Sequence, residues 1–259
     1  MLRGLDGGSM AASPTLAEVL GDYLDHRRRD AARDDLVGCE MTLEVLASFF
    51  SEENADLIPG AGRWLGAQGR WMGGAPPSAL LAPGLGVCLE LLPYSCCLSS
   101  MLIEFIPAEV RRLVRWLAEK KVPGGRGAPS LEPVLVEQAP VYRRFAALQG
   151  ALESAAAPWL TSLGEGVEGR FQVVRVAAPR VTVQVPGEGE RYTFGLPRGA
   201  TRLFHEGDRV AMVFARRALG WTALASSLPV GTAWMDQRLA RLRQAAGTRP
   251  VLEIAPRRE

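Results

Sequence analysis

The sequence predicts an α+β protein with a helical N-terminal domain, a small five-stranded antiparallel β-barrel and a C-terminal amphipathic helix. The main observation is a change of apolar period near Val167. Apolar residues before it recur every three or four positions, as in helices, whereas those after it alternate, as in strands. Turn-forming residues separate the alternating runs. We therefore predict an unstructured leader at 1–12, a helical domain at 13–160, the barrel at 161–228, and the last helix with its tail at 229–259.

Composition and charge agree with two modest globular domains. The chain has 259 residues, of which 47% are hydrophobic and 22% are charged, and both values are ordinary for a globular protein. Residues 1–160 hold 15 Lys and Arg against 19 Asp and Glu, a net charge of −4. Residues 161–259 hold 15 against 9, a net charge of +6. The C-terminal part is therefore the one expected to meet an acidic partner.

The first helix has a clear start signal, and the second is predicted from its apolar spacing. Thr15 and Glu18 form a T-x-x-E capping box, which predicts a helix over about 14–29. A second amphipathic pattern runs to about Phe50, and we expect the two helices to pack as a pair. The run Arg27–Arg29 is interpreted as the solvated end of the first helix, where cations suit the helix dipole.

Three further helical segments complete the predicted domain. Pro107 is expected to open a helix that ends near Val122, because proline is favoured in the first helical turn. Residues 134–152 follow as mostly helical, and 155–161 closes the helical half. The apolar stretch 80–106 is interrupted by proline and glutamate, so we predict core packing there rather than a membrane span.

A near repeat is the oddest local feature, since Gly62–Gly66 (GRWLG) is echoed seven residues later by Gly69–Gly73 (GRWMG). If the stretch is helical, the glycines share one stripe and the tryptophans another, which favours close packing against a neighbouring helix. The alternatives are a loop that binds a partner and a loop that stacks on nucleic-acid bases. The candidate contact residues are Arg63, Trp64, Arg70 and Trp71.

Five β-rich runs are expected to form the barrel, at 171–176, 181–185, 191–194, 209–214 and 220–224. Pro186–Gly189 is a predicted hairpin loop, and Glu206–Asp208 is predicted to turn the chain into the fourth strand. A helical turn is expected at 198–204. Five short strands with this spacing fit a closed or partly closed barrel of SH3-like or OB-like kind, in which closure removes exposed edges.

The chain after the barrel is predicted to form an amphipathic helix over Trp234–Ala246 that docks on the body. The tail after it is expected either to add an edge strand at Val251–Ile254 or to stay loose.

The histidine and cysteine content fits few catalytic or metal-binding schemes. His26 and His205 are the two histidines, and neither has a nucleophile at a recognised spacing. The four cysteines form no CxxC pair, so we expect free thiols in a reducing, cytoplasmic compartment. A metal site built from the clustered Cys88, Cys96 and Cys97 is the minor alternative. No secretory signal, P-loop or dinucleotide fingerprint is present, and we predict no cofactor, no metal and no membrane association.

Two parts of the chain resemble known proteins. Residues 168–226, with a G-D-x-V turn before one strand and a G-W pair opening the next, resemble the small β-barrels that end several uncharacterised prokaryotic proteins. Residues 15–50 and 107–122, as in TLAEVLGDYLDHRRR and VRRLVRWLAEKK, are loosely similar to the core-binding segment of tyrosine recombinases. The Arg, His-x-x-Arg and Tyr residues of those enzymes are missing, so the resemblance implies DNA or partner binding without catalysis.

Arginine dominates the cations, since the chain has 28 Arg and, as lysines, only Lys120 and Lys121. Arginine favours bidentate contacts with phosphate or carboxylate. The barrel concentrates Arg170, Arg175, Arg180, Arg191, Arg198, Arg202, Arg209, Arg216 and Arg217, interleaved with Phe171, Tyr192, Phe194 and Trp221. The alternative is that these arginines only form the solvent-exposed face of the strands and bind nothing.

We therefore predict a non-catalytic binding or scaffold protein that engages an acidic partner through the barrel surface. The predicted contacts are Arg198, Arg202, Arg209, Arg216, Arg217 and Trp221, together with the four residues of the repeat. Nucleic-acid binding is the first alternative, and an enzyme of unrecognised type is the second.

Overall fold

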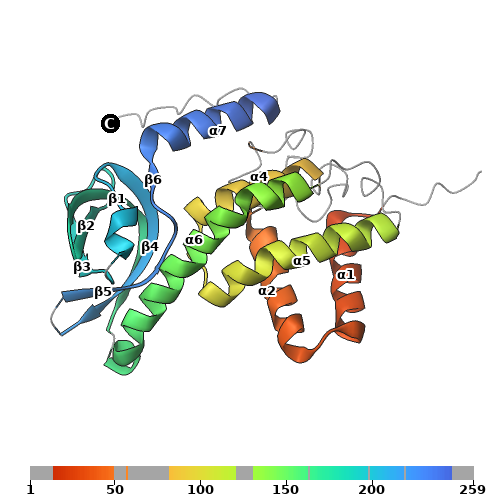
Figure 1. The fold of residues 1–259 in the computed structure, drawn as a ribbon, viewed down its shortest axis with the longest axis horizontal. Helices are drawn as coiled ribbons and strands as arrows, with labels where there is room; N and C mark the ends of the chain where they lie inside the picture. Colours follow the sequence, from red (N-terminus) through yellow and green to blue (C-terminus); the bar gives the residue numbers. More distant parts are fainter. Residues whose placement is uncertain are drawn as a thin grey trace, which may run out of the picture.

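A computed structural model describes residues 14–49, 57, 82–120, 131–162, 164–197, 199–218 and 220–246. A helical part and a β-barrel lie side by side, with a last helix above their junction (Figure 1). The α+β fold class predicted from the sequence is confirmed. The predicted leader, the GRWxG repeat and the edge strand at Val251–Ile254 lie outside the described residues. In the part of the chain described, no helix has the length and apolar character needed to cross a bilayer.

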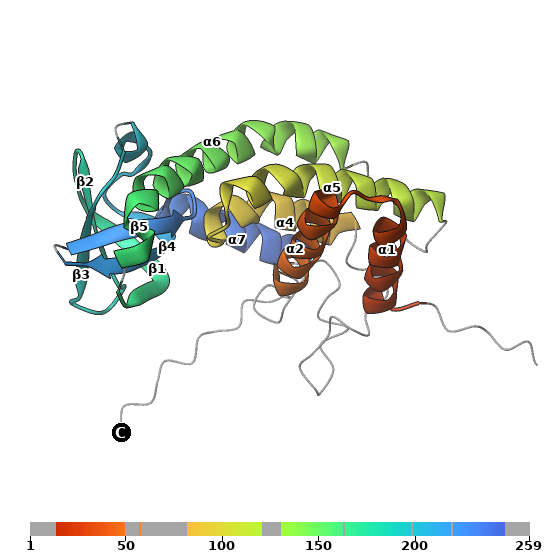
Figure 2. The same cartoon turned by 90° about the horizontal axis from the view of Figure 1, so that it is seen from below.

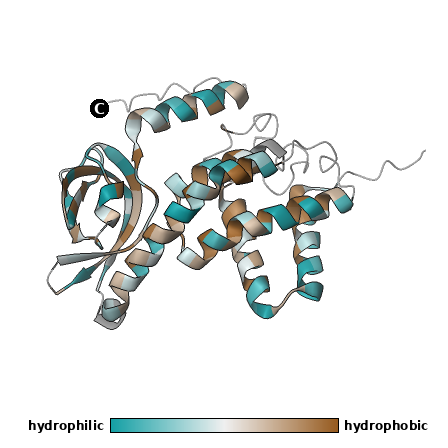
Figure 3. Cartoon of the chain, in the orientation of Figure 1, coloured by the Kyte–Doolittle hydropathy of each residue, from teal (hydrophilic) through white to brown (hydrophobic). Residues whose placement is uncertain are grey.

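The helical part holds a close array of helices that the view from below separates most clearly (Figure 2). Their bounds are Leu16–Asp30 (α1), Arg33–Phe49 (α2), Ala82–Ser95 (α4), Ser100–Glu119 (α5), Glu132–Ala156 (α6) and the 3₁₀ helix Ala157–Ser162 (η3). Colouring by hydropathy shows α4 as largely hydrophobic and α1 as largely hydrophilic (Figure 3). Accordingly, Leu85, Cys88, Leu89 and Leu92 of α4 are fully buried.

The capping box at the start of α1 forms as predicted. The Thr15 hydroxyl accepts the Glu18 backbone N–H, and the Glu18 carboxylate accepts the Thr15 backbone N–H. Helices α1 and α2 pack as the expected pair. The interpretation of Arg27 as part of a solvated end is wrong, because its Nε donates to the carboxylate of Glu109, which is only 1% exposed.

Helix α5 begins earlier than predicted. It starts at Ser100 and runs through Pro107, which the sequence analysis had placed at the helix start. The Ser99 hydroxyl caps the first turn by accepting the Leu102 N–H, and the Glu153 carboxylate of α6 accepts the Ser100 N–H at 2.9 Å. These caps and the burial of the first two turns outweigh the single backbone hydrogen bond that the proline removes.

The barrel consists of the strands Gly166–Ala177 (β1), Arg180–Gln184 (β2), Arg191–Gly195 (β3), Asp208–Arg217 (β4) and Gly220–Ser226 (β5). Neighbours follow the order β1-β2-β3-β5-β4, and β4 pairs back with β1 to close the barrel. The prediction of an all-antiparallel barrel is wrong in one pairing, because β3 and β5 run parallel, joined at Phe194 and Trp221. Closure requires this pairing, since β5 is the strand that reaches the free edge of β3.

The predicted turns and the strand alternation set the barrel core. Gly187 in the β2–β3 loop and Gly207 before β4 have φ angles of 81° and 91°, a backbone conformation that residues with a side chain rarely adopt. The predicted helical turn is the 3₁₀ helix Ala200–Leu203 (η4). Alternate strand residues point inward, and the core rings belong to Phe171, Tyr192, Phe194 and Phe214.

The helical part and the barrel are joined by polar contacts. The Gln149 amide of α6 donates to Leu224 O at 3.1 Å and accepts from Ser226 N at 3.2 Å, as a neighbouring strand would. The two-residue strand Val230–Gly231 (β6), not predicted, pairs with β4 and leads into Thr232–Ala246 (α7). The predicted docking of this helix is observed, because Leu242 is buried and Arg238 binds Glu90 of α4.

Candidate functional site

The outer surface of β1, β2 and β3 forms a polar sheet face, here called the arginine face. Because residues opposite each other share a face, the strand register arranges it in three rows. The rows are Gln172–Gln184–Arg191, Arg175–Thr182–Thr193 and Ala177–Arg180–Gly195. Each row contains one arginine, and neighbouring rows lie about 6.7 Å apart by the strand rise.

The side chains of the arginine face are held by hydrogen bonds to uncharged acceptors. The Thr182 and Thr193 hydroxyls are 2.9 Å apart, and Arg191 Nε donates to Gln184 Oε1 at 3.0 Å. Within the described residues, Arg175, Arg180 and Arg191 form no ion pair. The nearest carboxylates in sequence are in the flanking turns, and the rows themselves contain none. The three rows are therefore positively charged, although the Glu206 carboxylate borders the face by accepting the Val176 N–H at 3.3 Å. Strands β2 and β3 lie on the side of the barrel away from the helices (Figure 1).

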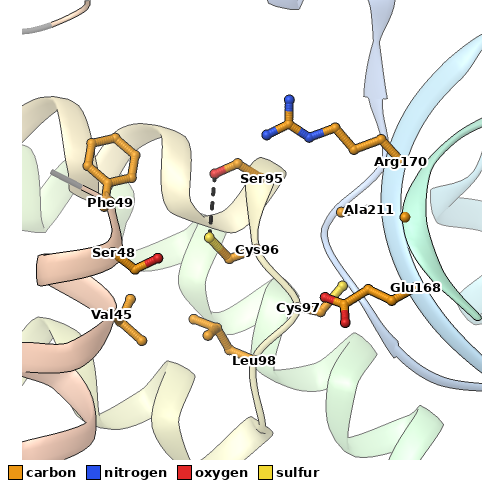
Figure 4. A pocket seen from close by; sticks show the side chains of 11 residues that line it. Val45, Ser48, Phe49, Ser95, Cys96, Cys97, Leu98, Glu168, Arg170 and Ala211 are labelled. Carbon is orange, nitrogen blue, oxygen red and sulfur yellow. Dashed lines mark hydrogen bonds between the residues drawn. The ribbon is translucent and has the colours of Figure 1, made fainter. Parts of the chain in front are cut away.

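A second concave site lies between the helical part and the barrel. It is a cavity of about 540 Å³ whose walls are the end of α2, the segment after α4 and the first half of β1. In Figure 4 the Arg170 side chain extends from β1 toward Ser95, and Glu168 lies beside Cys97. A neighbouring cavity of about 370 Å³ shares Phe49, Ser95, Arg170 and Ala211 with it. We call the two together the interdomain groove.

The thiols of the interdomain groove are neutral at physiological pH. Burial raises the pKa of Cys96, and the Ser95 hydroxyl and the Arg170 charge offset this only in part. Burial also raises the pKa of Cys97 to about 12. Since the thiolate is the nucleophile and the metal ligand, these cysteines are poorly suited to either role. In the described ranges, no three His, Cys, Asp or Glu side chains lie close enough together to hold a metal ion.

The contacts predicted on the barrel are dispersed rather than gathered. Arg209 lies at the start of β4 and pairs with Asp236 at 2.8 Å, whereas Arg216 lies at the other end of that strand, roughly 23 Å away by the strand rise. Arg217 stacks over Trp159 with its guanidinium 4.8 Å from the ring centre. Arg202 is exposed on η4.

Trp221 is half-buried, and its ring packs on Tyr192 at 5.1 Å. The other rings expected to interleave with the arginines, those of Phe171, Tyr192 and Phe194, point into the barrel core. Arg198, Arg63, Trp64, Arg70 and Trp71 lie outside the described residues, so their predicted roles stay predictions.

The two histidines have carboxylate neighbours. His26 Nδ1 lies 3.3 Å from Asp30, and its ring stacks on Trp116. His205 Nδ1 lies 3.4 Å from Asp208, and its side chain is 76% exposed, so the predicted turn position of His205 is confirmed. Among the described contacts, neither imidazole is hydrogen-bonded to a hydroxyl or thiol that would serve as a nucleophile.

Arg175, Arg180 and Arg191 were expected on the barrel but were not among the predicted contacts. Alternation was a sufficient signal for Arg180 and Arg191, which directly precede the inward Val181 and Tyr192. It was misleading for Arg175, because alternation from the inward Phe171 and Val173 predicts an inward side chain, and a β-bulge between Val173 and Arg175 turns it outward. The interdomain groove had no such signal. It combines residues from α2, α4 and β1 that are far apart in the chain.

Comparison with known proteins gives no match: no family model, no curated protein and no solved structure is similar to this chain.

Proposed function

We propose that the protein is a non-catalytic binding protein that engages an acidic partner through the arginine face. The observation that carries this proposal is the register of β1, β2 and β3, which puts Arg175, Arg180 and Arg191 on one surface in three rows that contain no carboxylate. A guanidinium with no carboxylate partner keeps its full charge and its donor fork for an incoming phosphate or carboxylate.

The flanking side chains suit the same role. Thr182, Thr193, Gln172 and Gln184 supply hydroxyl and amide groups that hydrogen-bond to oxyanions without adding charge. Because the aromatic rings of these strands point inward, the face offers cations and donors but no stacking platform. The proposed contacts are therefore with the partner's charged groups.

Nucleic acid is the second candidate, and the strand order favours it. The order β1-β2-β3-β5-β4, closed on β1 with β3 parallel to β5, supports the OB-like alternative, because β3 pairs with β5 rather than with β4. OB-type barrels bind oligonucleotides and oligosaccharides on the face of their second and third strands. Those strands carry two of the three arginines of the arginine face.

Cytoplasmic localisation belongs to the same proposal. All four cysteines are free thiols in the structure, and free thiols are typical of a reducing compartment.

The test is a binding titration with a charge-matched control. Replacing Arg175, Arg180 and Arg191 with Gln should abolish most binding of a fluorescent poly-glutamate peptide or of a labelled oligonucleotide. The control replaces Arg115, Arg143 and Arg144, which are exposed on the helical part, and removes the same charge.

Salt dependence separates the two candidates. Phosphate contacts predict that the logarithm of affinity falls linearly with the logarithm of salt, with a slope of about −0.7 to −0.9 per phosphate. The arginine-face variant should then lose about two to three units of slope, and the control variant much less. Equal losses in both variants, or no binding of either polyanion at low salt, would reject the arginine face as the binding surface.

A further inference from the structure

The interdomain groove has a cationic centre. Arg170 lines both of its cavities, so the guanidinium lies where they adjoin. Its neighbours at this point are the Ser95 hydroxyl and the Cys96 thiol, whose heavy atoms are 3.8 Å apart. Within the part of the chain described, Arg170 has no ion-pair partner. Because the Cys96 thiol is neutral, it does not compensate the arginine charge.

The larger cavity is polar around this centre. Ser48 from the end of α2 and Ser95 from the end of α4 line it, and both side chains carry hydroxyls. Glu168 lies on the same outward side of β1 two residues from Arg170, beside Cys97 (Figure 4). This carboxylate is the one negative side chain among the described lining residues, and it does not pair with Arg170.

The smaller cavity is apolar. Its described wall includes the aliphatic side chains of Leu91, Val230, Met235 and Leu239, which come from α4, β6 and α7. The ring of Tyr94 also lines it, but that ring already packs on Trp234 at 5.4 Å. The cavity therefore offers a largely aliphatic surface, to which the rings of Phe49 and Phe171 add.

The other charged side chains in the described wall of this apolar cavity are arginines. Arg209 and Arg243 line it, and Arg209 pairs with Asp236. Small-molecule sites in proteins are typically concave, largely apolar and supplied with a few polar groups that fix orientation. The volumes of about 540 and 370 Å³ are each within the size range of such sites.

From this arrangement we infer that the interdomain groove binds a small amphipathic anion, with a carboxylate or phosphate head at Arg170 and an aliphatic tail along Leu91, Met235 and Leu239. The head group accepts hydrogen bonds from the guanidinium and lies beside the Ser95 hydroxyl, which donates its own proton to Leu91 O at 3.0 Å. The aliphatic tail covers the side chains of Leu91, Met235 and Leu239 and so buries their apolar surface. Such a ligand contacts α4, α7 and β1 at once and so bridges the helical part and the barrel. This site is separate from the arginine face and does not depend on the proposed function.

The test is titration calorimetry on the full chain, with octanoate as the probe and octanol as its uncharged counterpart. The wild type should bind octanoate more tightly than octanol by about tenfold or more, because a hydrogen bond to a charged group is involved. Arg170→Gln should weaken octanoate binding by at least about tenfold and leave octanol binding unchanged.

Two matched variants keep the inference falsifiable. Arg175→Gln removes the same charge from the second half of β1, on the arginine face, and should leave octanoate affinity unchanged. Glu168→Gln removes the competing carboxylate and should strengthen octanoate binding. Both positions are exposed, so the fold should be retained, and thermal melts check this.

The inference is overturned if octanoate fails to bind at millimolar concentration, if octanol binds equally well, or if Arg170→Gln and Arg175→Gln weaken octanoate alike. Failure of the proposed function looks different, because it concerns polyanion binding and the response to Arg175, Arg180 and Arg191. Octyl phosphate in place of octanoate then identifies which head group the site prefers.

Discussion

The helical part buries an ionised carboxylate at its centre, whereas the core of the barrel is built from aliphatic and aromatic side chains. Glu109 of α5 accepts hydrogen bonds from Tyr23 at 2.6 Å, from Arg27 at 3.0 Å and from Arg112 at 2.8 Å. In the barrel, by contrast, Phe171 and Phe214 meet at 4.9 Å, and the arginines of the strands point outward.

This difference follows from how strands and helices distribute side chains between the core and the solvent. A strand alternates strictly, so a charged residue between two inward residues must face out. A helix packed among other helices can bury a charged residue if partners from those helices satisfy it. Tyr23 and Arg27 of α1 do this for Glu109 of α5. The location of charge is therefore set locally in the barrel and by long-range contacts in the helical part.

The largest expected effect is in the barrel core. Phe214→Ala removes a fully buried ring that contacts Phe171, Tyr192 and Phe194. The free energy of unfolding should fall by about 3–5 kcal/mol because a cavity replaces the ring. Denaturant unfolding measures the loss. Thr193→Ala on the outer surface should cost at most about 1 kcal/mol, and an equal cost for both variants would contradict the described core.

The next effect tests the buried carboxylate. Glu109→Gln keeps the shape but leaves Arg27 and Arg112 without their charged partner, so the free energy of unfolding should fall by about 2–3 kcal/mol. Glu119→Gln, exposed on the same helix, is the control and should change stability little. If both variants melt together, Glu109 contributes no more than a surface glutamate.

The same variant has a defined pH dependence. Burial alone raises the pKa of Glu109, but hydrogen bonds from Tyr23, Arg112 and Cys39 and the charge of Arg27 together hold it below the ordinary value of 4.5. A lowered folded-state pKa stabilises the fold above the unfolded-state pKa, and this stabilisation is lost as the pH falls through the folded-state pKa. The stability gap between wild type and Glu109→Gln should thus be complete near neutral pH and shrink below about 4.5.

The smallest effect concerns the junction of the two regions. Gln149→Leu leaves Leu224 O and Ser226 N of β5 without the partner that joins them to α6, at a cost of about 1–2 kcal/mol. Amide exchange at Ser226 of β5 should accelerate, while exchange in α6 stays slow. Gln138→Leu on the same helix serves as the control. Unchanged exchange at Ser226 would show that the barrel and the helices are held together by other contacts.

Much of the local structure was predictable from neighbouring residues. The capping box of Thr15 and Glu18, the turns at Gly187 and Gly207, and the outward positions of Arg180 and Arg191 each depend on a few consecutive positions. The start of α5 was not predictable in this way. Pro107 gives a strong local start signal. The helix nevertheless begins seven residues before it, where the Ser99 hydroxyl caps the first turn and the Glu153 carboxylate of α6 accepts the Ser100 N–H.

The two candidate sites differ in the same respect. The outward positions of Arg180 and Arg191 could be derived from alternation once the strands were known. The outward position of Arg175 and the arrangement in successive rows required the paired strands and the bulge in β1. The interdomain groove could not be derived, because Arg170, Ser95 and Met235 have no sequence relation to one another. Their proximity results from the docking of α4 and α7 against the barrel.

The sequence by itself determined the order of helices and strands apart from α4 and β6, the outward direction of most charge on the barrel and the positions of its tight turns. These properties depend on periodicity and on backbone conformations that one or two residues impose. The tertiary structure alone decided the parallel pairing of β3 with β5, the burial of Glu109 and the groove around Arg170. Each of these joins segments distant in the chain, and their free energy comes from contacts that exist only once those segments have packed together.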